Sequence, residues 1–216
     1  MIELIQRSGM QLNQDPQLAG LYARALGGKG AYERADQQLK RTYPLYVAAI
    51  EAERLPLSSL REWYEDLYAV YVNRDPAAGD QLALDLAGEN RGLWQNVGHG
   101  TYWALYGKPG LPKAIEYQKR ALEQTDPSNA SFMTTMMNVL GSYQIANDQR
   151  QDAADTFKSI IDKYPDDPSA LNNYAYILAK HLDRPEEALP YAERAVTLAP
   201  DSLDILDTMA TLHTKM

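Results

Sequence analysis

The chain has 216 residues, an apolar fraction of 45% and a net charge of −8, which suits one or two folded domains. The charge is uneven, because residues 1–120 carry 14 acidic and 14 basic side chains whereas residues 121–216 carry 15 and 7. Such a chain repels the phosphate backbone, so no nucleic-acid partner is expected. Two explanations of the acidic excess stay open: helix caps and Asp-Pro turns, or a surface that prefers a basic or neutral partner.

Cysteine is absent, which excludes disulfides and thiolate metal sites. Residues 1–7 contain no apolar core of a signal peptide, and no stretch approaches 18 apolar residues. We therefore expect a soluble chain with neither signal peptide nor membrane span. Its compartment stays open between cytoplasm and periplasm.

Helical periodicity runs from end to end and is interrupted by turn signals roughly every 15 residues. No alternating strand pattern of useful length lies between these signals, so the chain is predicted to be all-α. The signals are Asp15-Pro16, Gly27-Gly28-Lys29-Gly30, Tyr43-Pro44, Leu55-Pro56, Asp75-Pro76, Gly107-Lys108-Pro109-Gly110, Asp126-Pro127, Tyr164-Pro165, Asp167-Pro168 and Ala199-Pro200.

Residues 1–90 contain two candidate helix pairs. Residues 18–26 followed by 32–41 form the first, and residues 63–71 followed by 77–86 form the second. An additional apolar stretch, 45–55, lies between them, and Pro44 is expected to separate it from the preceding helix.

Residues 91–216 repeat themselves. The order large, large, small recurs at spacings of 34 and 35 residues, after a longer first step. Its four occurrences are Trp94, Val97 and Gly98; Met137, Leu140 and Gly141; Leu171, Tyr174 and Ala175; and Leu206, Met209 and Ala210. A fixed period of this length indicates a stacked helical array, in which small residues lie where two helices cross closely.

The second helices complete the pattern with Ala153, Phe157, Ile160 and Pro165, then with Ala188, Tyr191, Ala195 and Pro200. Ala114, Tyr117 and Ala121 fill most of these places in the first clear unit. This pattern resembles the tetratricopeptide repeat (TPR). The resemblance implies a right-handed α-solenoid of antiparallel helix pairs. Residues 91–216 would hold three clear TPR units plus the first helix of a further unit, and residues 1–90 degenerate TPR-like helical repeats.

The last helix pattern, with Leu206, Met209 and Ala210, has no second helix after it. Two interpretations stay open: a terminal capping helix, or an array that belongs to a longer protein. Ile205 and Leu212 add apolar bulk to this helix, and we expect their side to be exposed. Self-association through the C-terminal end is therefore predicted.

Catalytic motifs are missing from the sequence. The two Gly-rich turns lack the spacing of a phosphate-binding loop, and the three histidines, at 99, 181 and 213, have no partner at i+4. There is no Gly-x-Ser-x-Gly elbow and no cysteine nucleophile. We therefore expect no enzyme, no metal site and no cofactor.

One constellation points to binding. The TPR resemblance implies that the first helices of the units line a concave groove, and polar side chains fill its positions here. Carboxamides both donate and accept hydrogen bonds, so a series of them along the groove can pair with the backbone of an extended peptide. The alternative is that these side chains only keep an exposed face soluble. The candidate groove residues are Gln95, Asn96, His99, Tyr102, Asn138, Ser142, Asn172, Asn173, Tyr176, Asp207 and Thr211.

Some TPR proteins hold a peptide's C-terminal carboxylate with Lys at position 5 of the repeat and Asn at position 9. This chain has amides or Asp at position 5 and no Asn at position 9, so that clamp is not expected. The function predicted is a non-catalytic scaffold that binds a protein or an extended peptide in an amide-lined groove. The alternative is a regulatory or structural TPR segment of a larger enzyme or envelope-assembly protein.

Overall fold

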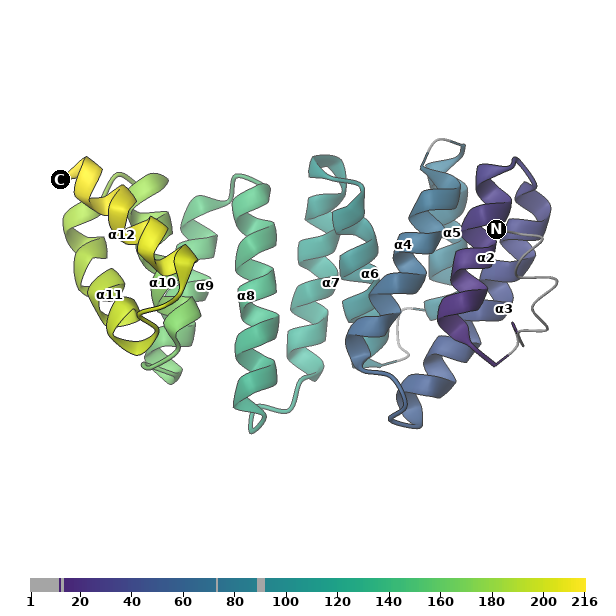
Figure 1. Cartoon of the computed structure of the whole chain (residues 1–216), viewed down its shortest axis with the longest axis horizontal. Helices are drawn as coiled ribbons and strands as arrows, with labels where there is room; N and C mark the ends of the chain where they lie inside the picture. The colour runs from purple at the N-terminus through teal and green to yellow at the C-terminus, as the bar shows by residue number, and fades with distance from the viewer. Residues whose placement is uncertain (1–11, 13, 73, 89–91) are drawn as a thin grey trace. The chain divides into compact units, whose positions relative to one another are not determined.

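The computed structural model describes residues 12, 14–72, 74–88 and 92–216. Residues 1–11 of the predicted N-terminal repeats lie outside this part. The described residues form α-helices and two short 3-10 turns, with no strand among them, so the predicted all-α class is confirmed (Figure 1).

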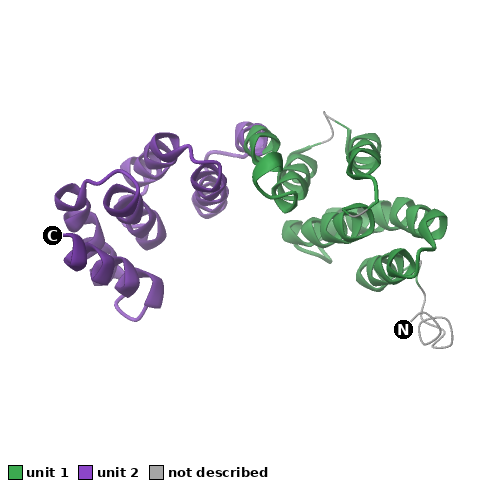
Figure 2. Cartoon of the chain, turned by 90° about the horizontal axis from the view of Figure 1, so that it is seen from above, with its two compact units in different colours: residues 1–117 green, residues 118–216 purple. Residues whose placement is uncertain are grey.

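The helices divide into two compact units, residues 1–117 and 118–216, each with its own packing (Figure 2). The boundary falls inside α7, so it differs from the change of repeat quality predicted at residue 90, which stays a prediction. The first unit contains α2 (Pro16–Gly28), α3 (Tyr32–Glu51), α4 (Leu60–Tyr71), α5 (Pro76–Ala87), α6 (Leu93–Leu105) and the start of α7 (Leu111–Gln124). The second contains the rest of α7, α8 (Ala130–Ala146), α9 (Arg150–Lys163), α10 (Pro168–Lys180), α11 (Pro185–Leu198) and α12 (Leu203–Lys215).

Three of the Asp-Pro signals are helix starts. The Asp15 carboxylate accepts a hydrogen bond from the Leu18 N–H (3.0 Å), and Asp75 and Asp167 accept in the same way from residues 78 and 170. The proline that follows each Asp occupies the first helical position, where its missing N–H is not needed.

Pro44 does not end a helix, which corrects the prediction of a break there. α3 continues through it to Glu51 and so includes most of the additional apolar stretch. Leu39, Tyr43, Tyr46 and Ala49 are buried along one side of the helix on both sides of the proline. Burial of this stripe outweighs the hydrogen bond that a proline cannot donate.

The core of the first unit is aromatic. Trp63 is fully buried, its indole N–H donates to the Leu39 carbonyl oxygen (3.1 Å), and its ring lies edge-on to Tyr43 and Tyr64. These contacts join α3 to α4. The additional helix length and the bulky rings explain why the TPR spacing is hard to read in this part of the sequence.

The core of the second unit follows the repeat pattern. Gly141, on α8, lies against the fully buried ring of Phe157 on α9, and Ala175, on α10, is also fully buried. Tyr174 of α10 packs edge-on against Tyr191 of α11, with ring centroids 4.8 Å apart. The small residues therefore lie at close helix contacts, as the spacing predicts.

The apolar surface of α12 differs from the prediction. Ile205 and Leu212 are buried, because they share one side of the helix with Thr208 and face α10 and α11. The large apolar side chains that α12 exposes are instead Leu203 (81%) and Leu206 (44%).

Candidate functional site

Seven of the predicted groove residues lie on three first helices of the second unit, and we call this set the amide face. α10 contacts both α8 and α12, so the three helices are neighbours. Each side chain of the set is at least partly exposed. The amide face consists of Asn138 and Ser142 on α8, Asn172, Asn173 and Tyr176 on α10, and Asp207 and Thr211 on α12.

Two carboxamides of the amide face bond to each other across the helix boundary. The Nδ2 of Asn173 donates to the Oδ1 of Asn138 at 3.1 Å. The Nδ2 of Asn138 and the Oδ1 of Asn173 have no partner among the described residues, and neither atom is sheltered from solvent. The pair therefore leaves one donor and one acceptor with access to solvent.

The remaining groups give the amide face a mixed polar and aromatic character. The Oδ1 of Asn172 is sheltered from solvent and has no hydrogen-bond partner in the described part of the chain. The Tyr176 ring lies beneath the Lys180 ammonium (5.2 Å to the centroid) and edge-on to His181. Partial burial, with the positive charges of Arg150 and Lys180, lowers the pKa of His181, which favours the neutral imidazole.

The predicted groove residues on α6 are not part of this surface. Gln95, Asn96, His99 and Tyr102 have exposed fractions between 0 and 4%, and all four lie inside the first unit. The His99 ring stacks on Tyr117, with centroids 4.6 Å apart. The groove predicted on α6 is therefore not an open surface in this structure.

A sequence signal for that burial was available. Gly98 and Gly100 flank His99, and a Cβ at position 98 would lie 2.3 Å from the Tyr64 ring of α4. Two glycines this close in a helix mark a backbone that another element approaches closely. The polar residue types of α6 alone do not reveal this packing.

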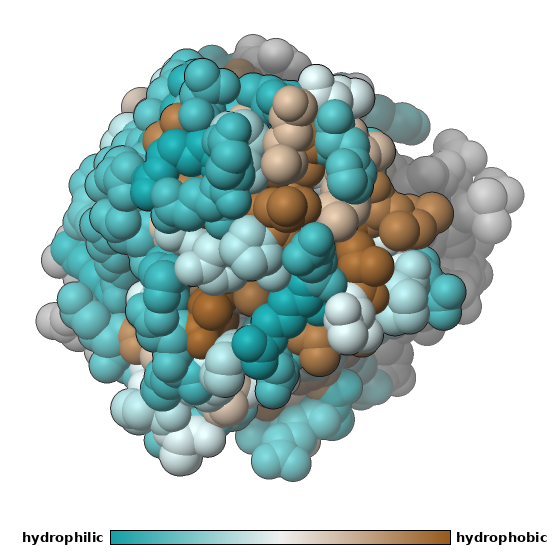
Figure 3. All heavy atoms as spheres, turned by 90° about the vertical axis from the view of Figure 1, so that its left-hand side faces the viewer, coloured by the Kyte–Doolittle hydropathy of each residue, from teal (hydrophilic) through white to brown (hydrophobic). Residues whose placement is uncertain are grey.

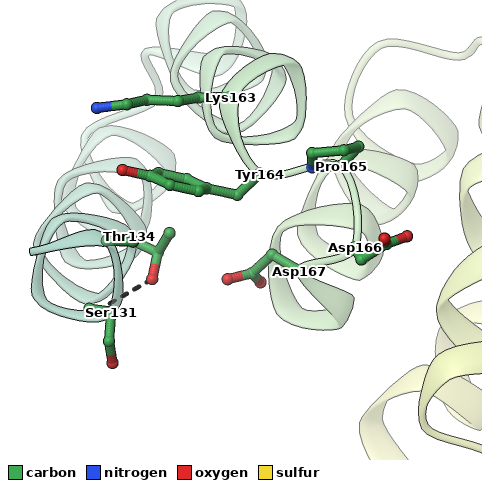
Figure 4. A pocket seen from close by; sticks show the side chains of 8 residues that line it. Ser131, Thr134, Lys163, Tyr164, Pro165, Asp166 and Asp167 are labelled. Atoms are coloured by element: carbon green, nitrogen blue, oxygen red, sulfur yellow. Dashed lines mark hydrogen bonds between the residues drawn. The ribbon is translucent and has the colours of Figure 1, made fainter. Parts of the chain in front are cut away.

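An open pocket of about 470 Å³ lies in the second unit, between the first turns of α8 and the loop that joins α9 to α10 (Figure 4). Its polar side chains are largely engaged by the chain itself. Asp167 caps α10, Asp166 pairs with Arg194, and the Thr134 hydroxyl donates to the Ser131 carbonyl oxygen. The Tyr164 hydroxyl is buried without a hydrogen-bond partner among the described residues.

A second pocket, of about 300 Å³, lies between α2 and α4 in the first unit. The buried Asp66 carboxylate pairs there with Arg24, 2.7 Å away. Burial raises the pKa of Asp66 to about 6, against the lowering effect of Arg24. The sequence did not predict this site, although Gly20 leaves room for it: a Cβ there would lie 1.9 Å from an Asp66 oxygen.

In the part of the chain that the structure describes, no three His, Asp or Glu side chains gather in a way that could hold a metal ion. None of the described helices has both the length and the apolar run that a bilayer crossing needs.

No protein-family model and no curated protein sequence matches the chain. Solved structures do. YrrB, a TPR protein with an unusual peptide-binding site, aligns over 97% of this chain and all of its own, with a TM-score of 0.52 and 17% identity. TTC0263, a thermophilic TPR protein in Thermus thermophilus, aligns over 93% and 99%, with a TM-score of 0.51 and 17% identity. At this identity the likeness concerns the fold, and it confirms the TPR solenoid predicted from the repeats.

Proposed function

Because the chain has the fold of the TPR proteins, we propose that it is a non-catalytic scaffold whose amide face binds an extended segment of another protein. The observation that carries the proposal is the bonded pair of Asn138 and Asn173. One outward donor and one outward acceptor are the complement of the C=O and N–H of a peptide backbone. Recognition of this kind depends on the backbone more than on the side chains of the ligand.

Two further observations support the amide face. Tyr176, three residues after Asn173 on α10, is partly exposed, and its ring can pack against a side chain of the ligand. The alignment with YrrB shows that a chain of this fold can carry a peptide-binding site, although the residues of that site are not transferred here. The buried residues of α6 are left out of the proposal.

The test uses Asn138→Asp. The carboxylate still accepts from Asn173, so the bond between α8 and α10 is kept, but the outward donor becomes an acceptor. Peptides are first selected on the wild-type chain from a displayed random library, and their affinities are then measured by calorimetry. We expect the variant to bind about tenfold more weakly, because an unmatched polar group in a contact costs about 1–3 kcal/mol.

The matched control is Gln151→Ala, which removes an exposed carboxamide from α9, away from the amide face. Its affinity should equal that of the wild type. Failure to enrich any peptide, or equal affinities for Asn138→Asp and the control, would contradict the proposal.

The salt dependence of the peptide affinity distinguishes the two explanations of the acidic excess in residues 121–216, which are helix caps and turns or a surface that prefers a basic or neutral partner. Apart from Asp207, the amide face is uncharged, so affinity should change little between low and high salt. A steep loss of affinity with salt would instead indicate that an acidic surface attracts a basic ligand.

A further inference from the structure

The helix α12 has a second apolar side that no described residue covers. Leu203, Leu206, Ala210 and His213 follow one another at intervals of three and four residues, so they share one side of the helix, and all four are exposed. We call this the open face of α12. Ile205, Thr208 and Leu212 form the buried side that packs on the rest of the unit.

The repeat register relates the open face of α12 to a buried surface of α10. Leu206 and Ala210 lie 35 residues after Leu171 and Ala175 of α10, which are 1% and 0% exposed. α11 is the helix that packs most extensively on α10. The open face is thus built like a surface that a further helix covers. Figure 3, which views this end of the molecule, shows apolar atoms at the surface between polar ones.

We propose that a second copy of this chain covers the open face, through antiparallel pairing of α12 with α12 around a two-fold axis. In such a pair Leu206 of each copy lies over Ala210 of the other, so a bulky side chain meets a small one twice. An isologous contact of this kind needs a self-complementary surface.

The charges of α12 favour the antiparallel arrangement. The acidic residue Asp204 lies in the first turn of the helix, and Lys215 lies in its last turn. Antiparallel pairing brings these opposite charges together and opposes the two helix dipoles, whereas parallel pairing would align like charges. Lys215 also lies 3.6 Å from the highly exposed Asp183, a weak surface contact that does not prevent this.

The small area of the contact limits the stability of the dimer. Stable dimers usually bury about 1,200 Å² or more, and a single helix of 13 residues offers less than this. We therefore expect a weak dimer, which forms in the micromolar range or above and dissociates on dilution.

The experiment is sedimentation of the full chain at micromolar to millimolar concentrations. The wild type should pass from monomer to dimer and go no further. The double change Leu203→Gln with Leu206→Gln should raise the dissociation constant about tenfold or more, since it removes the apolar contact. The control is Leu21→Gln, at a leucine of α2 that is about as exposed as Leu206 (48% against 44%), and it should associate as the wild type does.

Single cysteines test the orientation, because the natural chain has none. With Leu206 over Ala210, the axis passes residue 208, so two copies of residue 202 lie about 18 Å apart along the helices. A short thiol cross-linker should therefore join Ala210→Cys copies and leave Ser202→Cys copies unjoined.

Several results would overturn the proposal: a monomer at every concentration, association that survives the double change, growth beyond the dimer, or efficient joining of the Ser202→Cys copies. Binding of the open face to an unrelated helical peptide by a chain that stays monomeric would assign the surface to a different occupant. Peptide binding at the amide face is tested separately, with Asn138→Asp on α8.

Discussion

Single residues decide how closely the helices of this chain approach each other. A Cβ at Gly141 would lie 2.4 Å from the Phe157 ring, which is fully buried, so any shift of the ring disturbs its neighbours. We expect Gly141→Ala to lower the free energy of unfolding by about 1–3 kcal/mol, measured by urea denaturation. Gly28→Ala is the control, since no atom lies within 4 Å of its added methyl group and the change should be neutral or slightly stabilising. Equal effects at both positions would show that the contact is wrongly placed.

A second residue makes the stability depend on pH. The folded pKa of Asp66, about 6, is above its ordinary value of 3.8, so the folded state favours the protonated form. The stability that Asp66 contributes is therefore complete below pH 3.8 and is lost as the pH rises through 6. Between pH 7 and pH 5 the free energy of unfolding should rise by about 1 kcal/mol from this group.

Asp66→Asn cannot titrate, and so this contribution should vanish from its pH profile. Urea midpoints of the wild type and the variant, measured across the same pH range, provide the test. Parallel profiles would mean that another group causes the pH dependence.

Among the candidate site residues, accessibility was the property that the sequence could not supply. Asn138 and Asn173 were both predicted as groove residues on first helices, and the structure joins them by a hydrogen bond that the sequence did not predict. His99 was also predicted to lie in the groove, but Tyr64 and Tyr117 pack against its ring. Position in a repeat fixes the side of a helix, whereas burial depends on which other helix approaches that side.

At the scale of helices, Pro44 shows that the rule by which a proline ends a helix can fail. Pro44 is exposed and stands in the middle of α3, where it removes one backbone hydrogen bond. We expect Pro44→Ala to raise the free energy of unfolding by about 1–3 kcal/mol. Pro168→Ala, at the start of α10, is the control and should change little, because no hydrogen bond is missing there. A less stable Pro44→Ala protein would show that the packing of α3 requires the proline.

The two units also differ in how well their helices could be predicted from the sequence. The second unit has nearly regular spacing, so its helix pairs could be placed from the positions of Gly141 and Ala175. In the first unit, α3 is longer than a TPR helix and carries Tyr43 and Tyr46 into the core. There the core depends on aromatic contacts between helices, which no spacing rule predicts.

At the scale of the whole molecule, the two units have cores of different composition. All three tryptophans, Trp63, Trp94 and Trp103, belong to the first unit, and the second unit has none. Indole fluorescence therefore reports on residues 1–117 alone, while far-ultraviolet ellipticity reports on every helix of the chain.

Because of this difference, fluorescence and ellipticity follow the unfolding of different parts of the natural chain. Because each helix of an array contacts mainly its neighbours, Gly141→Ala should shift the ellipticity transition in urea and leave the fluorescence midpoint near that of the wild type. An equal shift in both signals would mean that the chain unfolds as one cooperative block. The separation of the two transitions is thus a direct measure of the coupling across α7, obtained without cutting the chain or attaching a dye.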